Sequence, residues 1–242
     1  MRKVHLIGAL VGVLALALSA IAVASPQFKQ TVDLEYSTKQ AQQPAGVSAE
    51  LHATDPGAQP AGNQPGVRTL KITFKGAKAN TRVGKLCRLP KDQADRCPAN
   101  TRVGTGTASA NLVGTNPTTG QPNVTVGLAQ NVAAYQTTGG FYFVVKGVDL
   151  PTTAILKATL SKRGALNVNV ERDLPVIPGG NKIVLTDFTV KIKKVTTGRG
   201  ARRKALITTP DCPRSRRFSV VAAFSYTDGS RKTLTSRQRC SG

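Results

Sequence analysis

Hydrophobic and polar residues alternate along most of the chain, and the alternation is clearest near the C-terminus. One parity there carries only apolar residues: Phe218, Val220, Ala222, Phe224 and Tyr226. A period of two is typical of a β-strand with one buried face. Asp228-Gly229 follows and predicts a tight two-residue turn, because Gly tolerates the positive φ that such a turn needs. Residues 212–240 are therefore predicted to form a β-hairpin, with Cys212 and Cys240 close together at its open end.

Alternation of the same kind predicts about ten strands in the whole chain. Besides the hairpin, they are residues 28–37, 47–53, 68–75, 101–112, 124–135, 140–148, 153–161, 165–171 and 182–195. Turns rich in Gly and Pro separate them, and a single helical turn is expected only at residues 90–95. Residues 141–145 are apolar on both parities, so we expect this strand to be covered on both faces. Glycines at the start of the 101–112 strand indicate a bulge or close strand packing. The pattern favours an all-β fold, an antiparallel β-sandwich.

The first 24 residues have the composition of a cleaved signal peptide. Arg2 and Lys3 precede an apolar run, and Ala22-Val23-Ala24 is a small-x-small cleavage site. An uncleaved membrane anchor is the alternative, since the run is nearly long enough to span a bilayer. Residues 25–242 are expected to form a single β-sandwich domain, and residues 111–123 are the best candidate for an internal boundary. The mature chain is expected to be secreted, or associated with the cell envelope.

Four cysteines lie in the expected mature chain: Cys87, Cys97, Cys212 and Cys240. An even number in an oxidising compartment argues for two disulfides. Of the three pairings that four cysteines allow, we favour the two local ones, Cys87 with Cys97 and Cys212 with Cys240. Closing the longer loop should contribute about 3 kcal/mol by restricting the unfolded chain. A zinc site is the competing interpretation, but no C-x-x-C spacing supports it.

The chain is strongly basic, with 34 Lys and Arg residues against 12 Asp and Glu residues. Without Arg2 and Lys3, 32 basic residues remain against 12 acidic ones, a formal net charge of +20. A charge of this size favours polyanions or an anionic membrane surface as partners. A specific nucleic-acid partner is not expected, because export leads away from nucleic acid and few aromatic rings are available for base stacking.

Basic residues concentrate in the C-terminal third, which we interpret as a candidate site for anionic polymers. Ten of them fall between residues 191 and 217, where Asp211 is the only acid. The candidate site consists of Lys191, Lys193, Lys194, Arg199, Arg202, Arg203, Lys204, Arg214, Arg216, Arg217, Arg237 and Arg239. Arginine makes bidentate contacts with phosphate and carboxylate groups, so an anionic envelope polymer or an acidic glycan is the expected partner. The alternative is a solvated face whose charges only block strand edges.

Few residues suit catalysis. His52 is the only histidine after the signal segment, and no G-x-S-x-G motif supplies a nucleophile for it. Ligands for a metal are equally scarce, so neither a metal nor a cofactor is expected. Asp33 and Glu35 share a strand face beside basic residues that keep them ionised, unlike a general acid, and Glu171 and Asp187 are expected in turns. We expect a non-catalytic protein; the alternatives are a carbohydrate-directed enzyme or lectin, and a secreted adhesin or assembly subunit.

Several short motifs resemble those of a group of uncharacterised, secreted proteins from actinobacteria. They are Cys97-Pro98, the following Val103–Gly106, the sequence LITTPDC at Leu206–Cys212, the sequence FSYTDG at Phe224–Gly229, and Cys240. These motifs are elements of a disulfide frame and of hairpin turns. The resemblance therefore implies a disulfide-containing β-sandwich and export, and it implies no activity.

Overall fold

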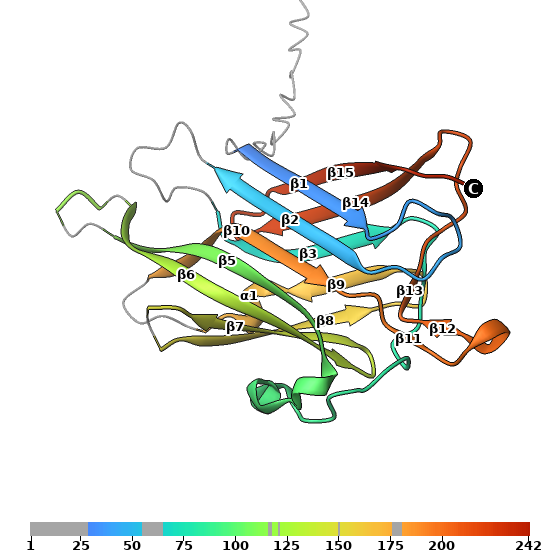
Figure 1. Ribbon diagram of the computed structural model, residues 1–242. Helices are drawn as coiled ribbons and strands as arrows, with labels where there is room; N and C mark the ends of the chain where they lie inside the picture. The colour runs from blue at the N-terminus through green and yellow to red at the C-terminus, as the bar shows by residue number, and fades with distance from the viewer. Residues whose placement is uncertain (1–28, 55–64, 116–117, 121, 150, 176–180) are drawn as a thin grey trace, which may run out of the picture.

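Strands make up most of the computed structural model, which describes residues 29–54, 65–115, 118–120, 122–149, 151–175 and 181–242 (Figure 1). The predicted all-β, antiparallel fold is confirmed, since all neighbouring strands of the main sheet run antiparallel. The helical turn expected at 90–95 is the 3-10 helix η1 (Lys91–Arg96), and the short helix α1 spans Val170–Asp173. Among the described residues, no helix has the length and apolar character needed to cross a membrane. The expected signal peptide, residues 1–24, lies outside the described residues.

Eleven strands form one sheet in the order β1-β2-β10-β5-β6-β7-β8-β9-β3-β14-β15. Their bounds are β1 Lys29–Tyr36, β2 Val47–Thr54, β3 Val67–Phe74, β5 Arg102–Thr115, β6 Pro122–Thr137, β7 Gly140–Gly147, β8 Thr153–Leu160, β9 Ala165–Asn169, β10 Lys182–Ile192, β14 Arg217–Tyr226 and β15 Arg231–Arg239. Two small sheets pair β4 (Lys78–Ala79) with β13 (Ile207–Thr208) and β11 (Thr196–Thr197) with β12 (Lys204–Ala205). Within residues 111–123, the candidate internal boundary, residues 111–115 and 122–123 belong to the paired ends of β5 and β6.

The main sheet is nearly closed, because it bends until its edge strands β1 and β15 lie side by side (Figure 1). Its two halves therefore face each other as the layers of a sandwich do. Side chains hold the seam between the edge strands. The Leu34 amide donates a hydrogen bond to the Ser236 hydroxyl at 3.2 Å. The Gln238 side chain accepts from the Tyr36 amide at 2.9 Å and donates to the Tyr36 carbonyl oxygen at 2.8 Å. Both edges thus satisfy backbone groups that an open sheet would expose.

The core lies between the two halves, and alternate residues of each strand point into it. The five apolar residues predicted to share a face of β14 are all buried. Strand β7 is buried along residues 140–145, which confirms that it is covered on both faces. Its outer face is covered by the loop between Cys87 and Cys97, whose buried Ala94 packs with Tyr142.

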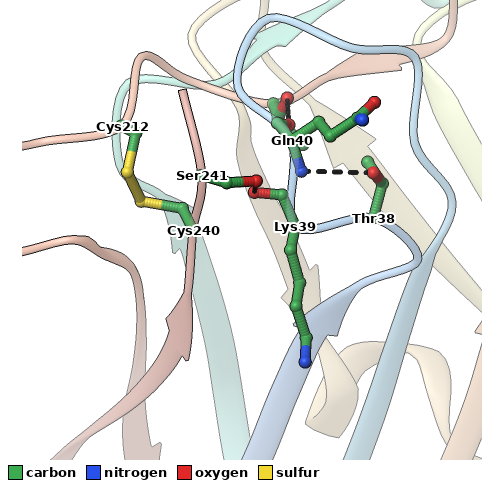
Figure 2. Close-up of a disulfide and its surroundings, with 7 residues drawn as sticks. Thr38, Lys39, Gln40, Cys212, Cys240 and Ser241 are labelled. Carbon is green, nitrogen blue, oxygen red and sulfur yellow. Dashed lines mark hydrogen bonds between the residues drawn. A yellow bond between two sulfur atoms is a disulfide. The ribbon is translucent and has the colours of Figure 1, made fainter.

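Both predicted disulfides are confirmed, Cys87–Cys97 and Cys212–Cys240, and no free cysteine occurs in the described chain. The second bond joins the two strands of the β14–β15 hairpin at the end opposite its turn (Figure 2). Beside it, the Ser241 amide donates to the Lys39 carbonyl oxygen at 2.8 Å, so the seam between the sheet edges continues past the strands. Two disulfides are compatible with an oxidising, extracellular environment.

The turn between β14 and β15 is longer than the two residues predicted. Strand β14 ends at Tyr226 and β15 begins at Arg231. The Asp228 carboxylate accepts a hydrogen bond from the Ser230 amide at 2.9 Å, and Gly229 has a φ of +84°. Aspartate side chains commonly bond the backbone two residues ahead, and this local bond supports the wider loop.

The glycines of β5 mark a close approach of two strands, as the sequence predicted. A Cβ built on Gly106 would stand 1.8 Å from the carbonyl oxygen of Thr189 in β10. No side chain fits at that position unless the backbone moves. The same strand also carries irregular registers against β10 and β6.

Candidate functional site

Antiparallel pairing brings the predicted basic residues to one end of the main sheet. Strand β10 finishes there with Ile192 opposite Val47, where β2 begins, and opposite Gly104 near the start of β5. Strand β14 begins there at Arg217, opposite Arg239 in β15. We call this the basic end; β11, β12 and the C-terminus are labelled there in Figure 1. The opposite end, where β2, β5, β7 and β14 finish, is called the open end.

Seven of the predicted residues lie at the end of β10 or in the segment that follows it. Lys191 is exposed near the end of that strand, and the amide of Lys193 donates to the Val103 carbonyl oxygen at 2.8 Å, which fixes the exit of the chain. Lys194 follows before β11 begins, and the other four lie on the β11–β12 hairpin, which projects from the molecule in Figure 1. Its tip is the 3-10 turn Gly200–Arg202. Its basic side chains, all exposed, are Arg199, Arg202, Arg203 and Lys204.

The other five predicted residues surround the Cys212–Cys240 disulfide. Arg214 and Arg216 lie in the loop that joins Cys212 to β14, and Arg216 has a φ of +51°. This left-handed backbone is unusual for a residue with a side chain. It is held because the Arg216 amide donates to the Pro213 carbonyl oxygen at 2.8 Å while its own carbonyl accepts from the Cys240 amide at 3.0 Å. The disulfide loop therefore presents its arginines in a defined backbone conformation.

All twelve predicted side chains are exposed, and none forms an ion pair within the part of the chain that the structure describes. Asp211, the acid in their midst, instead accepts a hydrogen bond from Gln42 Nε2. Arg217 and Arg239 stand directly opposite each other in neighbouring strands. Like charges in such a pair are destabilising. The protein thus concentrates positive charge here without neutralising it.

The basic end contains more cations than the sequence pattern assigned to it. They come from distant strand ends and turns that antiparallel pairing gathers at the same place. These additional exposed residues are Lys39, Lys75, Lys78, Arg82, Lys85, Arg102, Lys162 and Arg163. For example, Lys78 and Lys162 are 84 residues apart in sequence, yet the amide of Ala79, next to Lys78, donates a hydrogen bond to the Lys162 carbonyl oxygen at 3.0 Å. Exposed charges are screened within about 8 Å at physiological salt, so only neighbours such as these reinforce one another.

The single histidine of the described chain has a partner that was not predicted. His52 Nδ1 lies 2.7 Å from Asp187 Oδ1, across the pairing of β2 with β10. Asp187 is inside β10, so its expected place in a turn is wrong. The two side chains are 51% and 46% exposed, on the outer face of the sheet. Neither residue lines the two cavities described below. The pair therefore lacks the desolvated cleft that a general base uses.

A buried carboxylate also escaped the sequence analysis. The Asp173 side chain is fully buried, and its oxygens accept hydrogen bonds from Lys91 Nζ at 2.8 Å, Arg172 Nε at 3.1 Å and the Lys157 amide at 2.7 Å. Burial raises the pKa of this carboxyl, but the hydrogen bonds, led by that from Lys91, outweigh burial and set the pKa below its usual value. Asp173 joins α1 to β8 and to the Cys87–Cys97 loop, which is a structural role.

A shallow polar depression lies over the outer face of β3, β8 and β9. Its cationic lining consists of Lys71, Lys157 and Arg172, and the rest is lined by Thr and Asn residues together with Leu70 and Val168. Sequence reasoning missed it because β3 pairs with β9, nearly a hundred positions further along the chain. Within the described ranges, no group of three His, Cys, Asp or Glu side chains is placed to hold a metal ion.

Comparison of the chain with models of protein families, with curated proteins and with solved structures found no match. The functional argument therefore depends on the geometry and charge of the molecule itself.

Proposed function

We propose that this is an exported, non-catalytic binding protein of the cell envelope or extracellular space whose basic end binds anionic polymers. One observation carries the proposal: twelve exposed Lys and Arg side chains lie at one end of the sheet, without a carboxylate partner among the described residues. Repulsion between these unpaired charges destabilises the folded chain when it is alone, and a bound anion relieves that repulsion. The opposed pair Arg217 and Arg239 illustrates this balance.

The arrangement suits a repeating anion better than a single small one. The cations lie in three separate segments, namely the end of β10, the β11–β12 hairpin and the disulfide loop with the adjoining strands. A polymer can contact these segments in succession, whereas one small anion reaches only one of them. Arginine predominates in the hairpin and the disulfide loop, and its planar guanidinium forms paired hydrogen bonds with phosphate or carboxylate. The proposed ligand is therefore an envelope polymer or acidic glycan with repeating phosphate or carboxylate groups.

Export supports this choice of ligand. The N-terminal segment has the pattern of a signal peptide, and the two disulfides suit an oxidising compartment. Outside the cell, the abundant polyanions are those of the envelope and of secreted glycans, and not intracellular nucleic acid.

Salt-dependent binding tests the proposal. The protein would be titrated with fluorescent polyphosphate and with polygalacturonate, one polymer of phosphates and one of carboxylates, at several salt concentrations. The test variant replaces Arg202, Arg203 and Lys204 by Gln. The control variant replaces three exposed lysines elsewhere, Lys29, Lys71 and Lys146, by Gln, so that the net charge of the two variants is equal.

The binding constant K decreases with salt, so the plot of log K against log salt concentration has a negative slope. We expect the magnitude of this slope to decrease by about 2–3 in the test variant, because each anionic group that the protein no longer neutralises reduces it by about one. In the control variant the decrease should be less than about 1. Equal effects of the two variants would mean that only net charge matters, and the proposed site would be refuted. Binding of one polymer and not the other would identify whether phosphate or carboxylate is the recognised group.

A further inference from the structure

The interior of the nearly closed sheet contains a cavity of about 210 Å³. Its walls are formed by inward-facing residues of β2, β5 and β10 and by those of β3, β7, β8 and β9. Protein interiors are packed as closely as organic crystals, and voids larger than a water molecule are rare. A void of this size in the centre of a small protein therefore requires a cause.

Small side chains are the cause. Five alanines line the cavity: Ala49, Ala53, Ala108, Ala110 and Ala154. They come from three different strands, β2, β5 and β8. The larger residues opposite them in the neighbouring strands include Leu34 opposite Ala49, Phe188 opposite Ala108 and Leu185 opposite Ala110. Each alanine leaves space that a larger apolar residue would fill, so the cavity results from the amino-acid sequence of several strands together.

The cavity changes in polarity along its length. At the basic end, its lining is wholly apolar and includes Phe74, Phe141, Ile192 and Ile207, all of them buried. Its polar residues lie in the middle and at the open end; they are Gln30, Gln130, Thr152, Thr153 and Thr186. Gln30 is opposite Ala53 and Thr153 is opposite Lys146, and these pairings place both residues towards the open end. Half-buried side chains such as Leu112, Leu128 and Ile183 also line that end.

Water is a poor occupant of the deep part. A buried water needs two to four polar partners, and apolar cavities stay dry: one of about 150 Å³ lined by Leu, Ile and Phe binds benzene. We infer that this cavity binds an uncharged apolar group, the aliphatic chain of an amphiphile, with its polar part at the Gln- and Thr-lined open end. The inference is independent of the basic end, whose charged residues are not part of the cavity lining.

Titration with an uncharged dye, N-phenyl-1-naphthylamine, tests the inference on the full chain. Its fluorescence rises in apolar surroundings, and its lack of charge avoids the basic end. We expect saturable enhancement by the wild-type protein and displacement by linear alcohols from 1-hexanol to 1-decanol. Each added methylene should strengthen displacement about fourfold until the cavity is filled. High salt should leave dye binding unchanged while it abolishes polyanion binding, so the two proposals fail separately.

Cavity-filling variants locate the binding. Ala108→Leu fills the cavity from β5 and Ala154→Leu from β8, and Ala129→Leu makes the same change at an exposed position of β6 as the control. We expect the filling variants to weaken dye binding about tenfold, because less apolar area of the dye is buried, and the control to bind as the wild type does. Circular dichroism identifies any variant that does not fold; the half-buried Ala154 position tolerates the larger residue best. Absence of saturable binding by the wild type, or unchanged binding by a folded filling variant, would overturn the inference.

Discussion

Replacement of Asp173 by Asn probes the buried carboxylate that ties together three parts of the fold. Its side chain is fully buried and accepts hydrogen bonds from Lys91, Arg172 and the Lys157 amide. Asparagine has the same shape, but it offers one acceptor oxygen and directs N–H groups at donors. Hydrogen bonds to a charged group contribute about 1.5–3 kcal/mol each at most, and breaking a buried ion pair costs about 3–5 kcal/mol. Because Lys91 is 36% exposed and can return to water, we expect a loss of about 2–4 kcal/mol in the free energy of unfolding.

The dependence on pH gives a second, independent readout. The folded-state pKa of Asp173 is lowered, so its contribution to stability is fully present above the unfolded value of about 3.9 and is lost as the pH falls through the folded-state pKa. The difference between wild type and Asp173→Asn should therefore be largest near neutral pH and shrink in acid.

Urea denaturation followed by circular dichroism at pH 7, 5 and 3 measures this difference. Asp92→Asn is the matched control, because Asp92 is an exposed residue of η1, on the same loop as Lys91. It should change stability by less than about 0.5 kcal/mol at every pH. Equal stability of the Asp173 variant and the wild type, or a deficit that stays constant from pH 7 to pH 3, would refute the reasoning.

Three further changes test how the sheet is held. Replacing Cys212 and Cys240 by Ala should lower the free energy of unfolding by about 3–4 kcal/mol, because the disulfide no longer links two residues that are 28 positions apart in the unfolded chain. Urea denaturation without reductant measures this loss. Gly106→Ala should cost about 3 kcal/mol, since its Cβ meets a backbone oxygen at 1.8 Å, whereas Gly127→Ala, with no atom within 4 Å, should be nearly neutral in thermal melts. Gln238→Leu leaves two buried backbone groups of β1 unpaired and should cost about 2–3 kcal/mol, with faster amide hydrogen exchange in β1; unchanged exchange would show that the seam does not depend on this side chain.

Strands and disulfides could be predicted from the sequence because their causes are local. Alternation in β14 marks its buried face directly, and each cysteine lies close in sequence to its partner. The turn after β14 was misjudged because Asp228 bonds the Ser230 amide, a local choice that Asp-Gly alone does not specify.

Features that join distant segments could not be predicted. The seam depends on Ser236 and Gln238, which look like ordinary polar residues of an edge strand until β1 is placed beside them. Asp173 and Lys91 are 82 positions apart. The cavity arises from alanines on three strands, and no single strand reveals it. The predicted basic cluster was recognisable by composition, but its neighbours Lys78 and Lys162 join it only through strand pairing.

Lysine reactivity tests the central claim most directly, namely that recognition occurs at the basic end. The wild-type protein would be acetylated briefly with and without polyphosphate, and modification at each lysine would be quantified by mass spectrometry. The account predicts protection of Lys191, Lys193, Lys194 and Lys204 and unchanged reactivity of Lys29 and Lys146, which are exposed at the open end. Equal protection at both ends, or protection confined to Lys29 and Lys146, would contradict it.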